Sequence, residues 1–129
     1  MSKTPAKRTR KKPTAPALPG EIAQGITAAL DRKALDLVVL DLRKSQAFTD
    51  FFIICTGGNT RQVQAIADAV RAALGKGGVK PTLVEGETRS EWILIDYFDF
   101  IFHVFTPATR EFYGLERLWG DAERIEVSA

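Results

Sequence analysis

Two side chains of this sequence have the chemical types of a nucleophile and its base, Cys55 and His103. A cysteine acts as a nucleophile when a neighbouring base or cation favours its thiolate. Each residue lies inside an apolar run rich in Ile, Phe and Val, at 51–56 and 100–105. Burial there raises the pKa of a thiol, so we expect structural roles for both residues. His103 does not build a metal site either, because the chain has no second histidine and only this one cysteine. No cofactor is expected.

A second candidate for chemistry is the Gly57-Gly58 loop, in the stretch GGNT, which joins an apolar run to a helical pattern. Free N–H groups and the helix dipole at such a place attract phosphate. The loop lacks the GxGxxG spacing and the lysine of a P-loop. A nucleotidyltransferase would also need closely set carboxylates to hold magnesium. The nearest pair is Asp96 and Asp99, separated by an aromatic turn. A nucleotide-binding enzyme of nucleotidyltransferase type, using this loop, is therefore kept only as the alternative.

The element that must position Asp96, Asp99 and His103 is the stretch 91–105, EWILIDYFDFIFHVF, whose two short apolar runs predict a β-hairpin. Side chains alternate along a strand, so the first run has one face with Trp92, Leu94 and Asp96 and another with Ile93, Ile95 and Tyr97. Both faces are largely apolar and need a cover, from helices or from a partner. We expect Trp92, Leu94, Tyr97 and Phe98 to remain exposed as anchors of a protein interface.

The other elements follow from periodicity and from turn residues. Helices are predicted over 20–33, from the cap Asn59 to the glycines at 75–78, and from Thr106-Pro107 towards Trp119. Strands are predicted over 35–42, 51–56 and 79–85, the last parallel to the second through a crossover. With the hairpin, the order is αββαβββα. This predicts an α/β fold, with a single-layer mixed five-stranded sheet and flanking helices.

Charge is distributed unevenly along the 129 residues. Residues 1–20 carry six Lys or Arg and no acid, whereas the rest has twelve bases and sixteen acids, a net of −4. We expect 1–19 to be a disordered basic tail and 20–129 to be one α/β domain. Two interpretations of the tail stay open: an electrostatic contact with RNA, or a solubilising extension.

Cysteine usage and hydropathy bear on the compartment. The single cysteine excludes an intrachain disulfide framework and fits a reducing cytosol. No apolar run approaches the roughly 18 to 20 residues that cross a bilayer, and residues 1–19 lack the apolar centre of a secretory signal. We therefore expect a cytoplasmic protein with no membrane contact.

Five separated blocks of the sequence carry a family resemblance. They are LDLR at 40–43, TDFFIICTGGNTRQ at 49–62, VEG at 84–86, the hairpin, and LERLWGDA at 115–122. With these blocks the chain resembles the Iojap family, the bacterial ribosomal silencing factors RsfS, over about 26–127. It departs from the usual family residues at Asn59, Phe98 and Phe112, where Ser, Gly and Tyr are common. The change at Phe98 lies beside the expected interface.

The resemblance implies a nucleotidyltransferase-like fold without catalytic acids, hence no enzyme. It implies binding to the large ribosomal subunit through ribosomal protein L-fourteen, which blocks joining of the small subunit and represses translation. It also implies a homodimer when the protein is free. Carried over by position, the partner-binding residues are Trp92, Leu94, Asp96, Tyr97 and Phe98. Arg61, Gln62, Arg110 and Glu116 also match the family, and we expect them to fix local geometry rather than contact a partner.

Overall fold

The computed structural model describes residues 19–45 and 47–127. The expectation of a disordered tail falls almost wholly outside these ranges. Within them the chain forms four helices and six strands, in the order α1 (Gly20–Asp31), β1 (Leu35–Asp41), β2 (Phe51–Thr56), α2 (Thr60–Lys76), β3 (Leu83–Glu85), β4 (Trp92–Asp96), β5 (Phe100–Phe105), α3 (Pro107–Tyr113), α4 (Leu115–Leu118) and β6 (Glu123–Val127). None of the described helices is both long and apolar enough to span a bilayer.

All six strands belong to one mixed sheet, with the order β3-β4-β5-β2-β1-β6. The predicted hairpin is confirmed: β4 pairs antiparallel with β5, with Trp92 opposite Phe105 and Leu94 opposite His103. The one parallel pair among the described strands joins β2 to β5. Both strands of this pair are buried along their whole length, which explains their nearly continuous apolar sequences.

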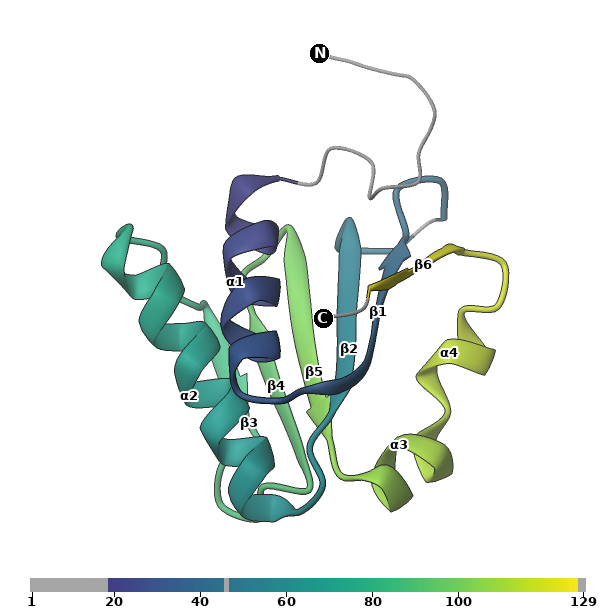
Figure 1. Ribbon diagram of the computed structural model, residues 1–129. Coiled ribbons are helices and arrows are strands. Elements are labelled where there is room, and N and C mark those ends of the chain that lie inside the picture. The colour runs from purple at the N-terminus through teal and green to yellow at the C-terminus, as the bar shows by residue number, and fades with distance from the viewer. Residues whose placement is uncertain (1–18, 46, 128–129) are drawn as a thin grey trace.

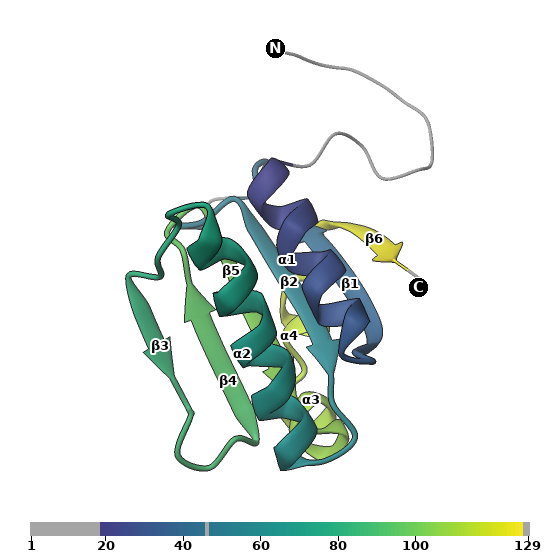
Figure 2. The ribbon, with the colours of Figure 1, turned by 60° about the vertical axis from the view of Figure 1, so that its left-hand side comes forward.

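One face of the sheet is covered by α1 and α2, which lie side by side across it (Figure 2). Their apolar stripes and the facing side chains of the strands form a continuous core, which includes Ile26, Ile66, Ile95 and Phe102. The approach of α1 to the sheet is close. A side chain at Gly25 would meet the ring of Phe102, which lies directly beneath that position.

The opposite face of the sheet has a smaller core and an incomplete cover. Its buried members come from the strands, among them Leu40, Phe52 and Phe105. The segments α3 and α4, which lie on this side of the molecule (Figures 1 and 2), contribute only partly buried side chains such as Leu115 and Trp119. This face therefore depends on short segments after β5, and part of the hairpin lies beyond their reach.

The expected count of five strands is wrong, because a sixth strand follows the helical segments. Residues 123–127 form β6 and pair antiparallel with β1, Val39 opposite Ile125 (Figure 1). Ile125 and Val127 pack against the larger core, while the charged side chains of this strand, Glu123, Arg124 and Glu126, remain exposed. A strand with this alternating sequence acquires its conformation from the open edge of β1.

The single final helix expected from Thr106 towards Trp119 is also wrong. It is two short helices, α3 and α4, separated by Gly114 in the left-handed conformation (φ 57°). Glycine adopts this conformation without strain and ends a helix there. The strand predicted over 79–85 is shorter than expected, and β3 lies at the sheet edge, paired with β4 rather than with β2. It does run in the same direction as β2.

Candidate protein-binding surface on the β4–β5 hairpin

Trp92 begins β4 on the less covered face of the sheet, where its side chain is only partly buried. Its ring stacks on Phe105, the residue directly opposite on β5, with ring centres 5.0 Å apart. The ring of Tyr113 on α3 also packs against Trp92, with ring centres 4.8 Å apart. The ring of Phe112 packs in turn against Tyr113, with ring centres 5.0 Å apart. We call Trp92, Tyr113 and Phe112 the aromatic ladder.

The aromatic ladder rises from the core to solvent. Phe112 is 78% exposed and Tyr113 is 52% exposed, whereas Phe105 beneath Trp92 is fully buried. A hollow of about 270 Å³ borders Trp92 and Tyr113 and is completed by the loop between β3 and β4. Exposed aromatic side chains beside a hollow are the usual anchors of a protein interface.

The residues expected in the interface divide between the two faces of the sheet. Leu94 and Asp96 lie on the same face as Trp92 and are partly buried. Phe98 is 70% exposed at the tip of the hairpin. Its backbone is left-handed (φ 75°), and its N–H donates to the Asp96 carboxylate at 2.7 Å. This bond makes a tight turn that directs the Phe98 side chain into solvent.

The expected exposure of Tyr97 is wrong. Only 7% of this residue is exposed, and its ring stacks on Phe100 within the core beneath α1 and α2. Burial raises the pKa of its hydroxyl, which has no hydrogen-bond partner among the described residues. Tyr97 thus supports the hairpin from the face opposite Trp92. As long as the hairpin is folded, it is not available for the contact surface.

The sequence interpretation missed the exposed side chains of α3 and α4. It read Phe112 as part of a continuous helix that points towards Trp119. The break at Gly114 instead leaves Phe112 and Tyr113 together beside Trp92, and leaves Leu118 72% exposed. The signal was available in the sequence, because a glycine inside a helical pattern often marks the end of a helix.

Cys55 and His103 do not form a thiolate–imidazole pair. They come from adjacent strands, β2 and β5, but Cys55 packs on the helix-covered side whereas His103 contacts Phe52 and Trp92 on the other side. Burial raises the pKa of the Cys55 thiol to about 12. Burial also lowers the pKa of His103 to about 3, so the imidazole is neutral. These values agree with the structural roles expected for both residues.

The Gly57-Gly58 loop uses its polar groups internally. The N–H of Gly58 donates to the side chain of Gln62 at 2.8 Å, and the N–H of Gln62 donates to the side chain of Asn59 at 2.9 Å. The predicted cap of α2 by Asn59 is thereby confirmed. A side chain at Gly57 would come within 2.8 Å of the Val63 nitrogen. Close packing against the start of α2 thus explains this glycine without any ligand.

Arg110 and Glu116 form a two-armed ion pair on the other side of α3. The Nε and Nη2 groups of Arg110 donate to the two carboxylate oxygens of Glu116 at 2.8 and 3.0 Å, and Arg124 of β6 adds a third contact. Arg110 also donates to the Asp36 carbonyl and the Thr56 hydroxyl. These bonds tie α3 and α4 to strands β1, β2 and β6 of the sheet. The charged groups of Arg110 and Glu116 therefore bind partners within the protein, whereas Arg61 is exposed on α2.

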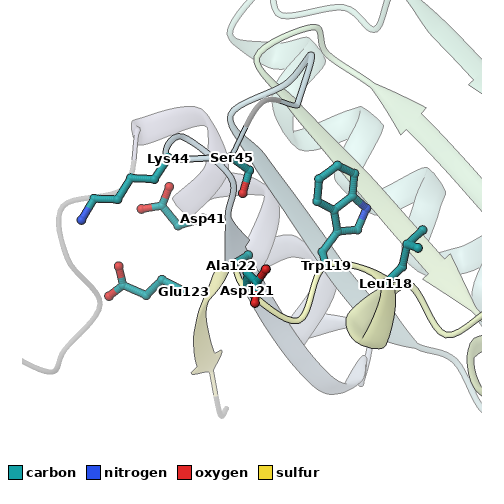
Figure 3. A pocket seen from close by; sticks show the side chains of 8 residues that line it. All are labelled: Asp41, Lys44, Ser45, Leu118, Trp119, Asp121, Ala122 and Glu123. Carbon is teal, nitrogen blue, oxygen red and sulfur yellow. The ribbon is translucent and has the colours of Figure 1, made fainter.

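A separate hollow of about 650 Å³ lies where α4 leads into β6 (Figure 3). Trp119 and Leu118 stand on one side of it, and Lys44 and Glu123 stand on the other. The nearby Asp41 is already paired with Arg43 at 2.7 Å. The described residues contain no group of three or more His, Cys, Asp or Glu side chains placed to hold a metal ion.

Comparison with known proteins identifies a family. A family model described as "Ribosomal silencing factor during starvation" matches residues 15–129. A ribosomal silencing factor of Halalkalibacterium halodurans is 38% identical over 102 residues, which is 79% of this chain and 87% of that protein. A mouse protein named "Mitochondrial assembly of ribosomal large subunit protein 1" is 30% identical over 89 residues, 67% of this chain and 39% of its own length. A crystal structure of a Chromobacterium violaceum protein is similar with a TM-score of 0.75 and 37% identity, covering 78% of this chain and 83% of that one.

Proposed function

This chain belongs to the RsfS family of ribosomal silencing factors, and on that premise we propose that it binds the large ribosomal subunit through ribosomal protein L-fourteen. By occupying that place it keeps the small subunit from joining and so represses translation. Silencing of this kind requires steric occupation and no chemical step. The site of action is the cytoplasm, where bacterial ribosomes are found.

The observation that carries the proposal is the aromatic ladder on an incompletely covered sheet face. A buried base at Phe105 and an exposed end at Phe112 give the surface a fixed shape and a large apolar area. Leu94 and Asp96 extend it along β4 towards Phe98 at the hairpin tip. Association of such a surface with a protein partner removes apolar area from water, which is the main driving force of binding.

Charge favours a protein as the immediate partner of the folded body. Residues 21–129 carry a net charge of −4, which repels the phosphates of ribosomal RNA. The mouse relative is named for assembly of the ribosomal large subunit, which supports the choice of that subunit. The basic residues 1–20 suit a different contact, a salt-sensitive one with ribosomal RNA.

The test is reassociation of purified large and small subunits in a sucrose gradient. The wild-type protein should leave the subunits separate and sediment with the large one. Trp92→Ala should weaken this binding by about 2 to 4 kcal/mol, because it truncates an aromatic anchor. Leu35→Ala is the matched control, since Leu35 is 50% exposed on β1, three strand positions away from β4. Equal binding by folded Trp92→Ala and wild-type protein contradicts the anchor, and an unchanged wild-type profile contradicts the function.

We also propose that the free protein forms a homodimer in which the aromatic ladder is covered. Dimer formation would then compete with ribosome binding and couple release to silencing. Light scattering over a concentration series measures it. A monomer at every concentration, or a dimer unaffected by Trp92→Ala, removes this idea.

A further inference from the structure

His103 occupies a buried position where an apolar residue would cost less free energy to bury. It is 3% exposed, and its ring lies edge-on to Phe52 with centres 4.5 Å apart. Its Nδ1 accepts the indole N–H of Trp92 at 3.1 Å, so the proton of the neutral ring sits on Nε2. That Nε2 has no hydrogen-bond partner among the described residues. A buried N–H without a partner destabilises a fold, so the imidazole must contribute something that an aliphatic side chain cannot.

The geometry points to a positioning role: His103 holds the indole of Trp92 in the orientation that the partner protein recognises. This inference rests on the proposed function of the surface. Leu94 lies opposite His103, and Trp92 is two residues earlier on the same face, so the two rings are diagonal neighbours across the strand pair. Stacking on Phe105 fixes the plane of the indole, and the bond to His103 fixes its rotation within that plane.

The same bond changes what a partner meets at the surface. A tryptophan at an interface usually needs an acceptor for its N–H when water is excluded. Here the acceptor is already supplied from within the sheet, so Trp92 can be covered without a new hydrogen bond. The remaining exposed part of the side chain is apolar. The partner recognised is therefore an apolar side chain or patch of a protein, placed against Trp92 and Tyr113, rather than a hydrogen-bond acceptor such as a phosphate.

Two amide substitutions separate positioning from packing. His103→Asn places an amide oxygen near the position of Nδ1, whereas His103→Gln places it near Nε2, beyond the reach of the indole. Glutamine is closer to histidine in length, so packing alone predicts that Gln is the better replacement. The positioning role predicts the reverse. Ile101→Val is the control, because Ile101 is buried on the same face of β5 and belongs to the same core.

The first measurement follows the two indole N–H signals by NMR, with Trp92→Phe identifying the signal of Trp92. Its chemical shift and its slow exchange with solvent should be kept in His103→Asn and lost in His103→Gln, while the Trp119 signal stays in place. The second measurement is binding to purified large subunits. His103→Gln should bind at least about ten-fold more weakly than wild type, and His103→Asn should recover most of that loss.

The inference is overturned if the Trp92 signal of His103→Gln keeps its wild-type shift and exchange. It is also overturned if His103→Gln, His103→Asn and Ile101→Val lose affinity in proportion to their loss of stability. If the wild-type protein itself fails to bind large subunits, the proposed function is wrong. The NMR measurement then decides the positioning role alone, which is rejected if every His103 variant keeps the wild-type Trp92 signal. Retention by Asn with loss in Gln still establishes that His103 orients Trp92.

Discussion

Substituting Glu116 tests how the segments after β5 are held to the sheet. Its carboxylate receives two bonds from Arg110 and one from Arg124, and its side chain is 22% exposed. These bonds to Arg110 and Arg124 lower the pKa of Glu116 from 4.5 to about 2 despite some burial. A difference of that size is worth about 3 kcal/mol in full. Because water reaches part of the group, we expect Glu116→Gln to lower the free energy of unfolding by about 2 kcal/mol at pH 7.

The sign of the pH dependence follows from the lowered pKa. The stabilising effect of the Glu116 carboxylate is complete above about pH 5, where the group is ionised in both states. It decreases as the pH falls through 4.5 towards 2, since the unfolded chain binds the proton first. More than half of the effect should be lost by pH 3. The difference between wild type and Glu116→Gln should therefore shrink between pH 5 and pH 2.

Urea unfolding of both proteins at several pH values measures this difference. Glu87→Gln is the matched control, because Glu87 is 48% exposed and pairs with Arg71, which is itself 39% exposed. The same chemical change there should cost less than about 0.5 kcal/mol. A difference for Glu116→Gln that is equally large at pH 7 and pH 2.5, or no larger than that for Glu87→Gln, would refute the reasoning.

Three further predictions concern single positions. Gly86→Ala should destabilise the protein by about 2 to 4 kcal/mol in urea unfolding, because φ is 91° and the added carbon meets the Trp92 carbonyl oxygen, whereas Gly20→Ala has free space and should be nearly neutral. Cys55 should resist an alkylating reagent at pH 8 until urea unfolds the chain, and rapid labelling of the native protein would contradict its burial. Phe98→Gly should raise stability by up to about 1 kcal/mol by relieving its left-handed backbone, and a loss of stability would show that the Phe98 side chain contributes packing.

The parts of the fold that could be predicted have local signals. The hairpin follows from two apolar runs around a short turn at 97–99, and its strands alternate in the way the sequence indicates. The start of α2 follows from Asn59 and Gln62, three residues apart, whose side chains cap the backbone. In both cases neighbouring residues determine the conformation, so the pattern is visible without knowledge of the rest of the chain.

The parts that were missed depend on distant contacts. Alternation correctly placed Tyr97 with Ile93 and Ile95, but sequence alone did not tell which face of the hairpin the two long helices would cover. Tyr97 was therefore expected at the surface and is buried. Likewise, β6 has charged residues at three of its five positions, and only the open edge of β1 makes it a strand. The nucleotidyltransferase-like character of the fold stays a prediction.

The exposed hairpin face is connected to the same interactions that stabilise the C-terminal segments. After α3 the chain turns at Gly114, and the bonds of Glu116 to Arg110 and Arg124 direct α4 towards β6. Trp119 then covers Phe52 on β2, with ring centres 5.9 Å apart, instead of lying over β4. The segments after α3 thus cover the middle of this face, at β2, and complete the sheet edge beside β1 with β6. Trp92 is left with a buried base and an open side, because the nearest helix ends one residue before Gly114. Loosening this ion-pair network should therefore disturb the position of Tyr113 against Trp92, even though Glu116 itself lies outside the aromatic ladder.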